Sequence, residues 1–256
     1  MQQIWPFRSA HHLDDADLEQ IYLVSGDLSR PWVQANMVTS IDGAIEVDGR
    51  SRPLSSPADQ RVFALGRDLA DVILVGRGTA IAENYRGVHP NEVNAERRRR
   101  LGLSPLPAIA VVSARCKIAP DSPLVTQTEV QPIVVTTTTA PEQRVAALRR
   151  AGADVIMAGD HCLDLHATLT ELAHRGLLRI DCEGGQQLLD AMLDADLVDQ
   201  LCLTIAPVLA GSNPSTATRA PRHLTLTSVL HEAGHLMLQY RRRGGEVQAD
   251  HPRPAV

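Results

Sequence analysis

The chain has 256 residues, of which 44% are hydrophobic, and a formal net charge of −5. This length suits one α/β domain with a large core, so we expect no division into further domains. No apolar run approaches the roughly eighteen residues of a membrane-spanning helix, and the acidic balance gives no reason to expect a nucleic-acid partner. Residues 1–6 lack the basic and apolar segments of a secretory signal, so we expect a cytoplasmic protein.

The first informative segment covers residues 36–63. An apolar strand ends in Ser40-Ile41-Asp42-Gly43, a Gly- and Ser-rich loop follows, and a helix begins at Pro57. Asp59 and Phe63 lie four residues apart on one face of this helix, so they could grip a flat heterocycle, the carboxylate by hydrogen bonds and the ring by stacking. The alternative is that Asp59 only favours the helix start while Phe63 belongs to the core.

Two short apolar strands are each followed by a glycine turn. Residues 70–75 lead into Gly76-Arg77-Gly78-Thr79, and residues 177–182 lead into Glu183-Gly184-Gly185-Gln186 before an amphipathic helix. Parallel strands end at one edge of a sheet, and exposed amides there attract phosphate, so the two turns could clasp one dinucleotide. The Rossmann fingerprint itself fails because Ile81 occupies the place of its third glycine. The alternative is that each turn is only a tight connection.

The remaining elements mostly alternate between strands and helices. We expect strands over 108–113, 133–137, 153–157, 178–182 and 198–206, helices near 141–150 and 164–175, and two final strands without helices between them. This order predicts a three-layer α/β/α fold whose central sheet is mostly parallel, with an antiparallel C-terminal edge. We also expect a long loop over 206–221 and a solvent-exposed helical face at residues 97–100, which are all arginine.

The turn after the strand at 108–113 indicates the type of cofactor. Ser113, Arg115 and Lys117 stand there, and no acid does. An acid near the adenosine ribose suits NAD, whereas a hydroxyl and a cation suit a 2′-phosphate, so we expect NADPH. The alternative is that Arg115 and Lys117 merely face water.

Two patterns bear on metal binding. Residues 231–235 read His-Glu-Ala-Gly-His, the H-E-x-x-H pattern of zinc hydrolases, which would need a continuous helix and a third ligand. Alternating apolar residues on both sides instead predict two strands with a hairpin turn at Ala233-Gly234. Cys116, Cys162, Cys182 and Cys202 form no C-x-x-C pair. We therefore expect free, buried thiols and no metal site.

Four motifs in order carry a family resemblance. They are S-I-D-G (40–43), A-D-V-I-L-V-G-R-G-T (70–79), E-G-G (183–185) and L-V-D-Q-L-C-L-T-I-A-P-V-L-A-G (197–211). The chain resembles the reductase domain of riboflavin biosynthesis, the RibD C-terminal family, over nearly its whole length. The resemblance implies a dihydrofolate-reductase-like fold, reduction of a ribosylaminopyrimidine phosphate with NADPH, and a homodimer. The helix with Asp59 and Phe63 is also similar to the substrate helix of bacterial dihydrofolate reductases.

The sequence departs from this family in the segment after the first glycine turn. Many members have D-N-P there, followed by a threonine and an arginine that hold the ribose phosphate, whereas this chain has Ala82-Glu83-Asn84-Tyr85-Arg86. Glu83 keeps a carboxylate and Arg86 could supply the cation, although the spacing differs. Asn36 stands where some members carry lysine and others asparagine. The zinc-deaminase signature of the bifunctional relatives is absent, so we expect a free-standing reductase.

We therefore expect one reductase domain over residues 1–256, with 1–30 as an N-terminal extension packed on it, that transfers a hydride from NADPH to a pyrimidine or pteridine. The expected substrate is 5-amino-6-(5-phosphoribosylamino)uracil or a related riboflavin intermediate; dihydrofolate and a non-catalytic NADP-binding role are the alternatives. The apolar final strand, 236–240, favours a homodimer if it forms an uncovered edge. Expected catalytic residues are Asp59, Asn36 and Glu83; substrate residues are Phe63, Leu54 and Arg86; cofactor residues are Val38, Ser55, Gly76, Gly78, Thr79, Ser113, Arg115, Glu183, Gly184, Gly185 and Gln186.

Overall fold

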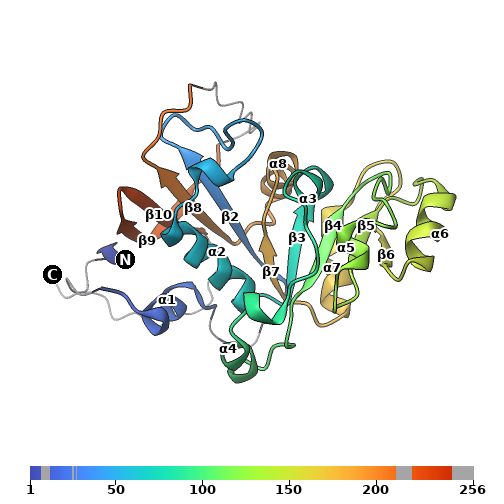
Figure 1. Ribbon diagram of the computed structural model, residues 1–256, viewed down its shortest axis with the longest axis horizontal. Helices are drawn as coiled ribbons and strands as arrows, with labels where there is room; N and C mark the ends of the chain where they lie inside the picture. The colour runs from blue at the N-terminus through green and yellow to red at the C-terminus, as the bar shows by residue number, and fades with distance from the viewer. Residues whose placement is uncertain (7–11, 25, 27, 212–220, 244–256) are drawn as a thin grey trace.

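The computed structural model describes residues 1–6, 12–24, 26, 28–211 and 221–243. In this part of the chain the strands form one ten-stranded sheet in the order β1-β9-β10-β8-β2-β7-β3-β4-β5-β6 (Figure 1). Neighbouring strands from β8 through β6 are parallel, whereas β10, β9 and β1 are antiparallel to their neighbours. The predicted sheet is thereby confirmed. The strands are β1 (Gln2–Trp5), β2 (Trp32–Ser40), β3 (Val72–Gly76), β4 (Ala108–Val112), β5 (Ile133–Thr136), β6 (Asp154–Met157), β7 (Arg179–Cys182), β8 (Gln200–Ala206), β9 (Leu224–Glu232) and β10 (His235–Arg242).

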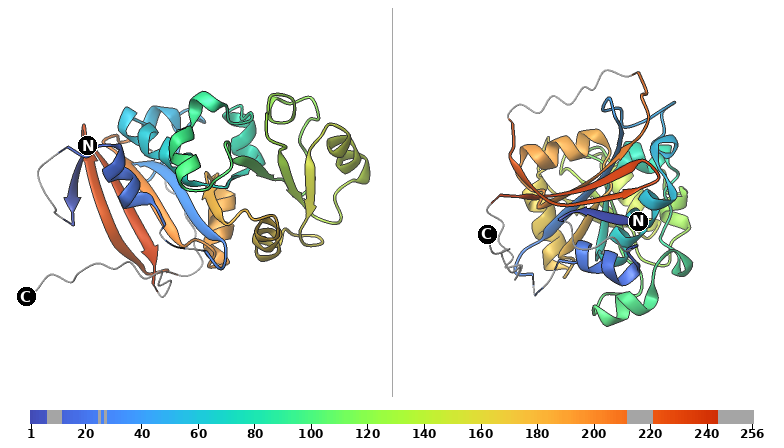
Figure 2. Two further views of the ribbon diagram at one scale, coloured as in Figure 1. Left: turned by 90° about the horizontal axis from the view of Figure 1, so that it is seen from below. Right: turned by 90° about the vertical axis from the view of Figure 1, so that its left-hand side faces the viewer.

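Helices cover both faces of the sheet (Figure 2). They are α1 (Asp15–Tyr22), α2 (Pro57–Leu69), α3 (Arg77–Ala82), α4 (Ala95–Arg100), α5 (Pro123–Thr126), α6 (Glu142–Arg150), α7 (Leu165–His174) and α8 (Gln186–Asp194), with short 3-10 helices η1 (Arg52–Leu54) and η2 (Pro90–Glu92). Helices α7 and α8 share a core with β2, β3 and β7, while α2 packs with α1 and with β8, β9 and β10. Within the described residues, no helix is both long and apolar enough to cross a membrane.

Helix α2 is positioned by its own sequence. The Ser56 hydroxyl caps its first turn by accepting a hydrogen bond from the Asp59 amide at 3.2 Å, and Pro57 occupies the first helical position. Its buried apolar residues recur at helical spacing and pack against α1 and strands β8 to β10; they are Ala58, Val62, Leu65 and Leu69. This packing sets α2 across the face of the sheet that also carries the even-numbered side chains of β2.

The N-terminal residues contribute directly to the fold. Strand β1 pairs antiparallel with β9. The capped helix α1 packs its buried residues Leu18 and Tyr22 into the same apolar cluster as α2. The outermost strand at this end of the sheet is therefore β1, on which Ile4 and Trp5 are exposed.

The final strands differ from expectation in one respect. The hairpin turn is confirmed, since Ala233 and Gly234 have φ of 49° and 82° between β9 and β10. However, β10 lies between β9 and β8 and is not an edge strand, and Met237 is fully buried. The apolar residues of β10 therefore pack within the sheet. The prediction that this strand forms an uncovered edge, on which the expected homodimer depended, was wrong.

Two expectations about exposure were only partly right, since Arg99 and Arg100 are exposed as expected but their neighbours are not. Arg97 and Arg98 of α4 are buried rather than solvated. Arg97 pairs with Glu19 and Asp68, and Arg98 donates hydrogen bonds to the carbonyls of residues 67, 68 and 70 at the end of α2. Burial is possible because both guanidinium groups find acceptors on other elements, although Nη2 of Arg98 has no hydrogen-bond partner among the described residues. Cys162 is exposed, whereas the other three cysteines are buried, and all four are free.

Candidate active site

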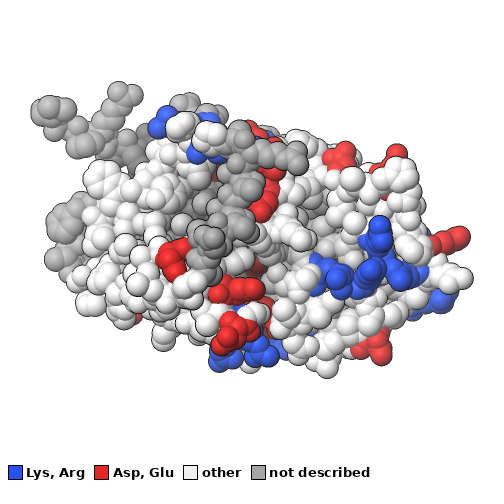
Figure 3. All heavy atoms as spheres, turned by 90° about the horizontal axis from the view of Figure 1, so that it is seen from above, with Lys and Arg blue, Asp and Glu red and all other residues white. Residues whose placement is uncertain are grey.

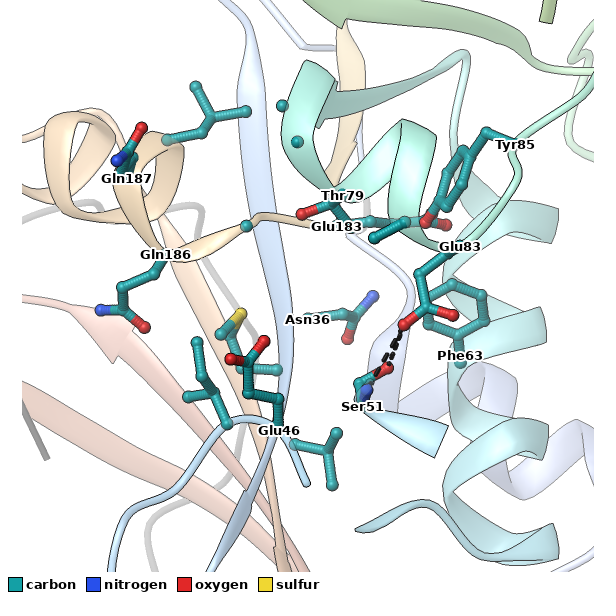
Figure 4. A pocket seen from close by; sticks show the side chains of 18 of the residues that line it. Asn36, Glu46, Ser51, Phe63, Thr79, Glu83, Tyr85, Glu183, Gln186 and Gln187 are labelled. Atoms are coloured by element: carbon teal, nitrogen blue, oxygen red, sulfur yellow. Dashed lines mark hydrogen bonds between the residues drawn. The ribbon is translucent and has the colours of Figure 1, made fainter. Parts of the chain in front are cut away.

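A pocket of about 1330 Å³ opens at the carboxyl ends of the parallel strands β2, β7, β3 and β4. Its walls come mainly from β2 and the loop after it, from α2, from β8 and β10, and from the segments that follow β3, β4 and β7. The structure thus brings most of the predicted site residues together. Those that line the pocket are Asn36, Val38, Ser55, Asp59, Phe63, Gly76, Gly78, Thr79, Glu83, Ser113, Arg115, Glu183, Gly185 and Gln186 (Figure 4).

Three of the predicted residues are not part of the pocket lining. Leu54 is 1% exposed and belongs to the interior. Arg86 forms a bidentate pair with Glu92, with N···O distances of 2.9 and 3.0 Å, which directs its guanidinium to η2. Gly184 joins the two glycine turns, because its carbonyl accepts a hydrogen bond from the Gly76 amide at 2.6 Å.

The two glycine turns form one continuous surface. They are adjacent because β3 and β7 are neighbours in the sheet. A Cβ atom on Gly185 would collide with the Thr79 hydroxyl, so the absence of a side chain at this position lets the two turns lie close together. Gly78 faces open space, with no atom within 4 Å of the place that its Cβ would take. A ligand's phosphates can therefore approach the backbone here, which fits a dinucleotide.

A buried ion pair forms the floor of the pocket between α2 and β7. Arg67 donates to both carboxylate oxygens of Glu183 at 2.6 and 2.8 Å, and the Tyr85 hydroxyl donates to the same carboxylate. The Arg67 guanidinium also stacks on the rings of Phe63 and Tyr85, 4.6 and 5.5 Å from their centroids. Burial and the Glu183 charge raise the pKa of Tyr85 well above its ordinary value, so this phenol remains a donor.

Arg67 and Tyr85 were not predicted as site residues. For Arg67 the sequence does contain a signal, because Asp59, Phe63 and Arg67 repeat at intervals of four along α2 and so continue one helical face. Burial alone would lower the pKa of Arg67, but the charge of Glu183 and its hydrogen bonds outweigh burial and raise it. Glu183 is therefore matched by a permanent cation. The same carboxylate was predicted to bind the cofactor, and its pairing leaves it fewer free acceptor positions.

Two carboxylates on the substrate side are held by serines of the loop after β2. Ser55 donates to Asp59 Oδ2 at 2.5 Å. Ser51 donates to Glu83 Oε1 through its amide and its hydroxyl, at 3.3 and 3.2 Å, and Figure 4 shows this contact beside Phe63. The loop and the segment after α3 are thus joined across the pocket.

A carboxylate outside the pocket lining ties two loops together. Asp42 accepts hydrogen bonds from the Ser40 hydroxyl at 2.5 Å and from the amides of Ala210 and Gly211 at 3.1 and 2.7 Å. These bonds, led by that of Ser40, lower the pKa of Asp42 to about 2. Asp42 therefore joins the loop after β2 to the segment after β8.

Charge is divided between the two ends of the pocket. Asp59, Glu83 and Glu46 line the end next to α2 and β2, together with the cation Arg52, while Arg77, Arg115 and Lys117 line the end that follows β3 and β4. In the view of Figure 3, Lys and Arg side chains gather to one side of a group of Asp and Glu side chains. The basic end contains Ser113, whose hydroxyl accepts a hydrogen bond from the Lys117 amide at 3.0 Å.

The histidine-rich motif does not form a metal site. His231 and Glu232 lie at the end of β9 and His235 at the start of β10, so the helix that zinc hydrolysis requires is absent from this segment. Glu232 instead pairs with the N-terminal amine at 2.7 Å. Across the described residues, no group of three or more His, Cys, Asp or Glu side chains is arranged to hold a metal ion.

Comparison with known proteins agrees with this geometry. The model of the RibD C-terminal domain matches residues 31–236. The chain belongs to the RibD C-terminal domain family. A relative from Archaeoglobus fulgidus, named 2,5-diamino-6-ribosylamino-4(3H)-pyrimidinone 5′-phosphate reductase, is 30% identical over 187 residues, which cover 73% of this chain and 84% of that protein. A protein of the same name from Methanothermobacter thermautotrophicus is 33% identical over 71% of this chain and 80% of its own length.

Solved structures share this fold. A pyrimidine reductase-like protein from Corynebacterium diphtheriae superposes with a TM-score of 0.71 at 27% identity, covering 82% of this chain and 91% of that one. The riboflavin biosynthesis reductase of Saccharomyces cerevisiae superposes with a TM-score of 0.61 at 20% identity, covering 87% of this chain and 96% of its own. At that identity the yeast enzyme supports the fold alone.

Proposed function

We propose that this protein is an NADPH-dependent reductase of a pyrimidine intermediate of riboflavin biosynthesis, a ribosylaminopyrimidine phosphate. The observation that carries the proposal is one pocket, in a chain of the RibD C-terminal domain family, that joins a glycine-turn surface with a basic end to an aromatic, acidic end. The family relatives named as reductases of such a phosphate support the same chemistry. A nicotinamide cofactor bound here supplies the hydride.

The residues at the basic end are assigned to the cofactor. The backbone around Gly76, Gly78 and Gly185 takes the phosphates, because the open space beside Gly78 admits them. Ser113 and Arg115, with the nearby Lys117, take the 2′-phosphate that distinguishes NADPH from NADH. Val38 of β2 lies on the wall that the nicotinamide would meet on its way to the acidic end.

The residues at the acidic end are assigned to the substrate. The carboxylate of Asp59 accepts hydrogen bonds from amino or N–H groups of the heterocycle and polarises the ring for proton transfer, with Glu83 and Asn36 as further polar partners. Phe63, whose ring already stacks on Arg67, presents a flat apolar surface to the heterocycle. The loop with Ser51 and Ser55 covers this end and helps to keep water from the reacting atoms.

The phosphate of the substrate needs a cation, and the structure suggests a different one from Arg86. Arg86 is paired with Glu92, and Arg67 is paired with Glu183. Arg52 of η1 lines the pocket on the substrate side, is exposed, and has no ion pair with any described residue. We therefore assign Arg52 to the anionic group of the substrate.

Dihydrofolate is the second candidate substrate, because Arg86, which was expected to hold a ribose phosphate, is paired with Glu92 outside the pocket. The deciding experiment measures NADPH oxidation by the purified chain with the ribosylaminopyrimidine phosphate and with dihydrofolate side by side. Turnover of the first alone supports the proposal, and turnover of dihydrofolate alone replaces the substrate. If neither substrate turns over while NADPH binds in calorimetry, the protein is a non-catalytic NADP-binding protein and the proposed activity is wrong.

A further inference from the structure

A row of polar side chains crosses the interior of the sheet beneath α2 and ends at the pocket. Its members are Arg241 of β10, Gln200 of β8, Gln34 and Asn36 of β2, and Asp181 of β7. They share one face because Arg241 stands opposite Gln200, Gln200 opposite Gln34, and Gln34 opposite Asp181 in the strand register. Gln200 is fully buried and Asp181 is 1% exposed, so the contacts within the row decide how each amide is oriented.

The hydrogen bonds from Arg241 to Gln34 run in one direction, whereas the bond from Asn36 to Asp181 runs the opposite way, so both sides of the row donate towards Asp181. A guanidinium can only donate, and Arg241 Nε donates to Gln200 Oε1 at 3.0 Å. The amide nitrogen of Gln200 is then directed to the far side, where it donates to Gln34 Oε1 at 2.7 Å. The same logic directs the nitrogen of Gln34 away from Gln200, towards Asp181.

Asp181 completes the row at Asn36. Its Oδ1 accepts a hydrogen bond from Asn36 Nδ2 at 2.6 Å. Burial, followed by the charge of Glu183, raises the pKa of Asp181 well above its ordinary value. Asp181 Oδ2 has no hydrogen-bond partner among the described residues, and Asp181 also lines a cavity of about 30 Å³ with Gln34 and Trp32, enough for one water molecule.

Helix α2 closes over this arrangement through a glycine. A Cβ on Gly66 would lie 2.7 Å from Asn36 Nδ2, 2.9 Å from Asp181 Oδ2 and 3.2 Å from Gln34 Nε2. The helix backbone therefore packs directly on these three polar atoms, and any other residue at this position would push them aside. The close approach holds Asn36 and Asp181 in their present contact.

We propose that Asp181 is a positioning residue of this active site, which turns the amide nitrogen of Asn36 away from the pocket so that the Asn36 carbonyl oxygen faces the ligand. Asn36 then acts as a hydrogen-bond acceptor and selects a substrate with an amino or ring N–H group at that point. The chemical class is an amino-substituted nitrogen heterocycle. The inference rests on the proposed function for its substrate, whereas the orientation of Asn36 stands on the contacts alone.

The orientation is tested first, without any turnover. The side-chain amide of Asn36 is followed by ¹⁵N–¹H NMR, and its signal is assigned by its loss in Asn36→Ser. Asp181→Val suits a strand and removes the acceptor, so we expect the Asn36 signal to shift and its hydrogen exchange to quicken at least tenfold. Asp181→Asn keeps an acceptor oxygen and should restore the wild-type signal. An unchanged Asn36 signal in Asp181→Val would overturn the inference.

The second test compares the effect of each variant on the substrate KM with its effect on the Kd for NADPH. We expect Asp181→Val to raise the substrate KM about tenfold, the effect of losing one well-placed hydrogen bond, while the calorimetric Kd for NADPH changes less than twofold. Asp181→Asn should keep KM within about threefold. Val33→Ala, a buried change on the opposite face of β2, controls for loss of stability alone. A KM that rises equally in Val33→Ala, or an equal loss of NADPH affinity, contradicts the positioning role.

Failure of this inference can be told apart from failure of the proposed function. If no substrate turns over, the proposed function is wrong, but the NMR signal of Asn36 still decides the role of Asp181. If Asp181→Val does not fold, Asp181→Ala removes the same acceptor without adding bulk near Gly66. An Asn36 signal in Asp181→Ala that matches the wild type then refutes the positioning role.

Discussion

Replacing Asp59 by asparagine separates a catalytic role from a structural one at the start of α2. The amide has nearly the size of the carboxylate and still offers an oxygen to the Ser55 hydroxyl, which now donates to Asp59 at 2.5 Å. The cap of the helix is formed by Ser56 and does not use the Asp59 side chain. The local structure therefore has no reason to change.

The expected magnitudes follow from this geometry. Loss of a negative charge from the first turn of a helix costs at most about 1 kcal/mol, which lowers the melting temperature of a chain of this size by roughly 2–4 °C. NADPH affinity should be unchanged, since Asp59 lies at the opposite end of the pocket from Arg115 and Lys117. Turnover should fall on the order of a hundredfold or more, the usual scale for a positioned acid-base group.

The assay is steady-state NADPH oxidation at saturating cofactor, with thermal melting and calorimetry on the same preparations. Phe63→Ala serves as a contrast, because loss of the flat surface should raise the substrate KM more than it lowers kcat. A wild-type rate in Asp59→Asn would refute the reasoning and transfer the acid-base role to Glu83 or Glu183.

Four further predictions test other parts of the site. NADPH should bind more than tenfold more tightly than NADH, because one charge-assisted hydrogen bond to the 2′-phosphate can supply that difference in affinity. Equal calorimetric affinities would contradict the assignment of the basic end to the cofactor. Gly78→Val should fold normally, because the space there is open, yet weaken NADPH binding; normal affinity would mean that the turn is only a connection. Arg52→Ala should raise the substrate KM about tenfold or more while Arg86→Ala leaves it nearly unchanged, and the reverse result would restore Arg86 as the anion ligand. We propose that the protein is a homodimer, since β1 is an edge strand that exposes Ile4 and Trp5; light scattering should give about twice 27.8 kDa, and a monomer mass at micromolar concentration excludes it.

The sequence predicted those parts of the structure that depend on short-range patterns. Continuous apolar runs such as 72–75 predicted buried parallel strands, and β3 is buried in the structure. The glycine turns at 76–79 and 183–186 follow neighbouring strands, as the rule for parallel sheets requires. Ala233-Gly234 predicted a hairpin because the flanking apolar residues alternate, and both residues adopt the left-handed backbone of such a turn.

The features that the sequence did not predict depend on partners far along the chain. Burial of Arg98 requires carbonyls about 30 residues earlier, and Asn36 finds Asp181, 145 residues away. The place of β10 inside the sheet depends on strand order, which local periodicity does not encode. Arg86 was expected to hold a phosphate because it is a cation near the first glycine turn. In the structure its guanidinium is instead hydrogen-bonded to Glu92.

The division of charge along the pocket has a consequence for ligand design. Acidic side chains border the end at β2 and basic ones the end at β4, three strand spacings or about 14 Å away across the sheet. An elongated molecule with one cationic and one anionic end is therefore favoured in the orientation that places its cation beside Asp59 and Glu83 and its anion beside Arg115 and Lys117, although Arg52 offers a second place for an anion at the acidic end. An inhibitor that links a protonated amino-heterocycle to an anionic group across that span would engage both half-sites at once. Its affinity would fall with salt concentration, and a chemically identical linker with the two charges exchanged would be its non-binding control.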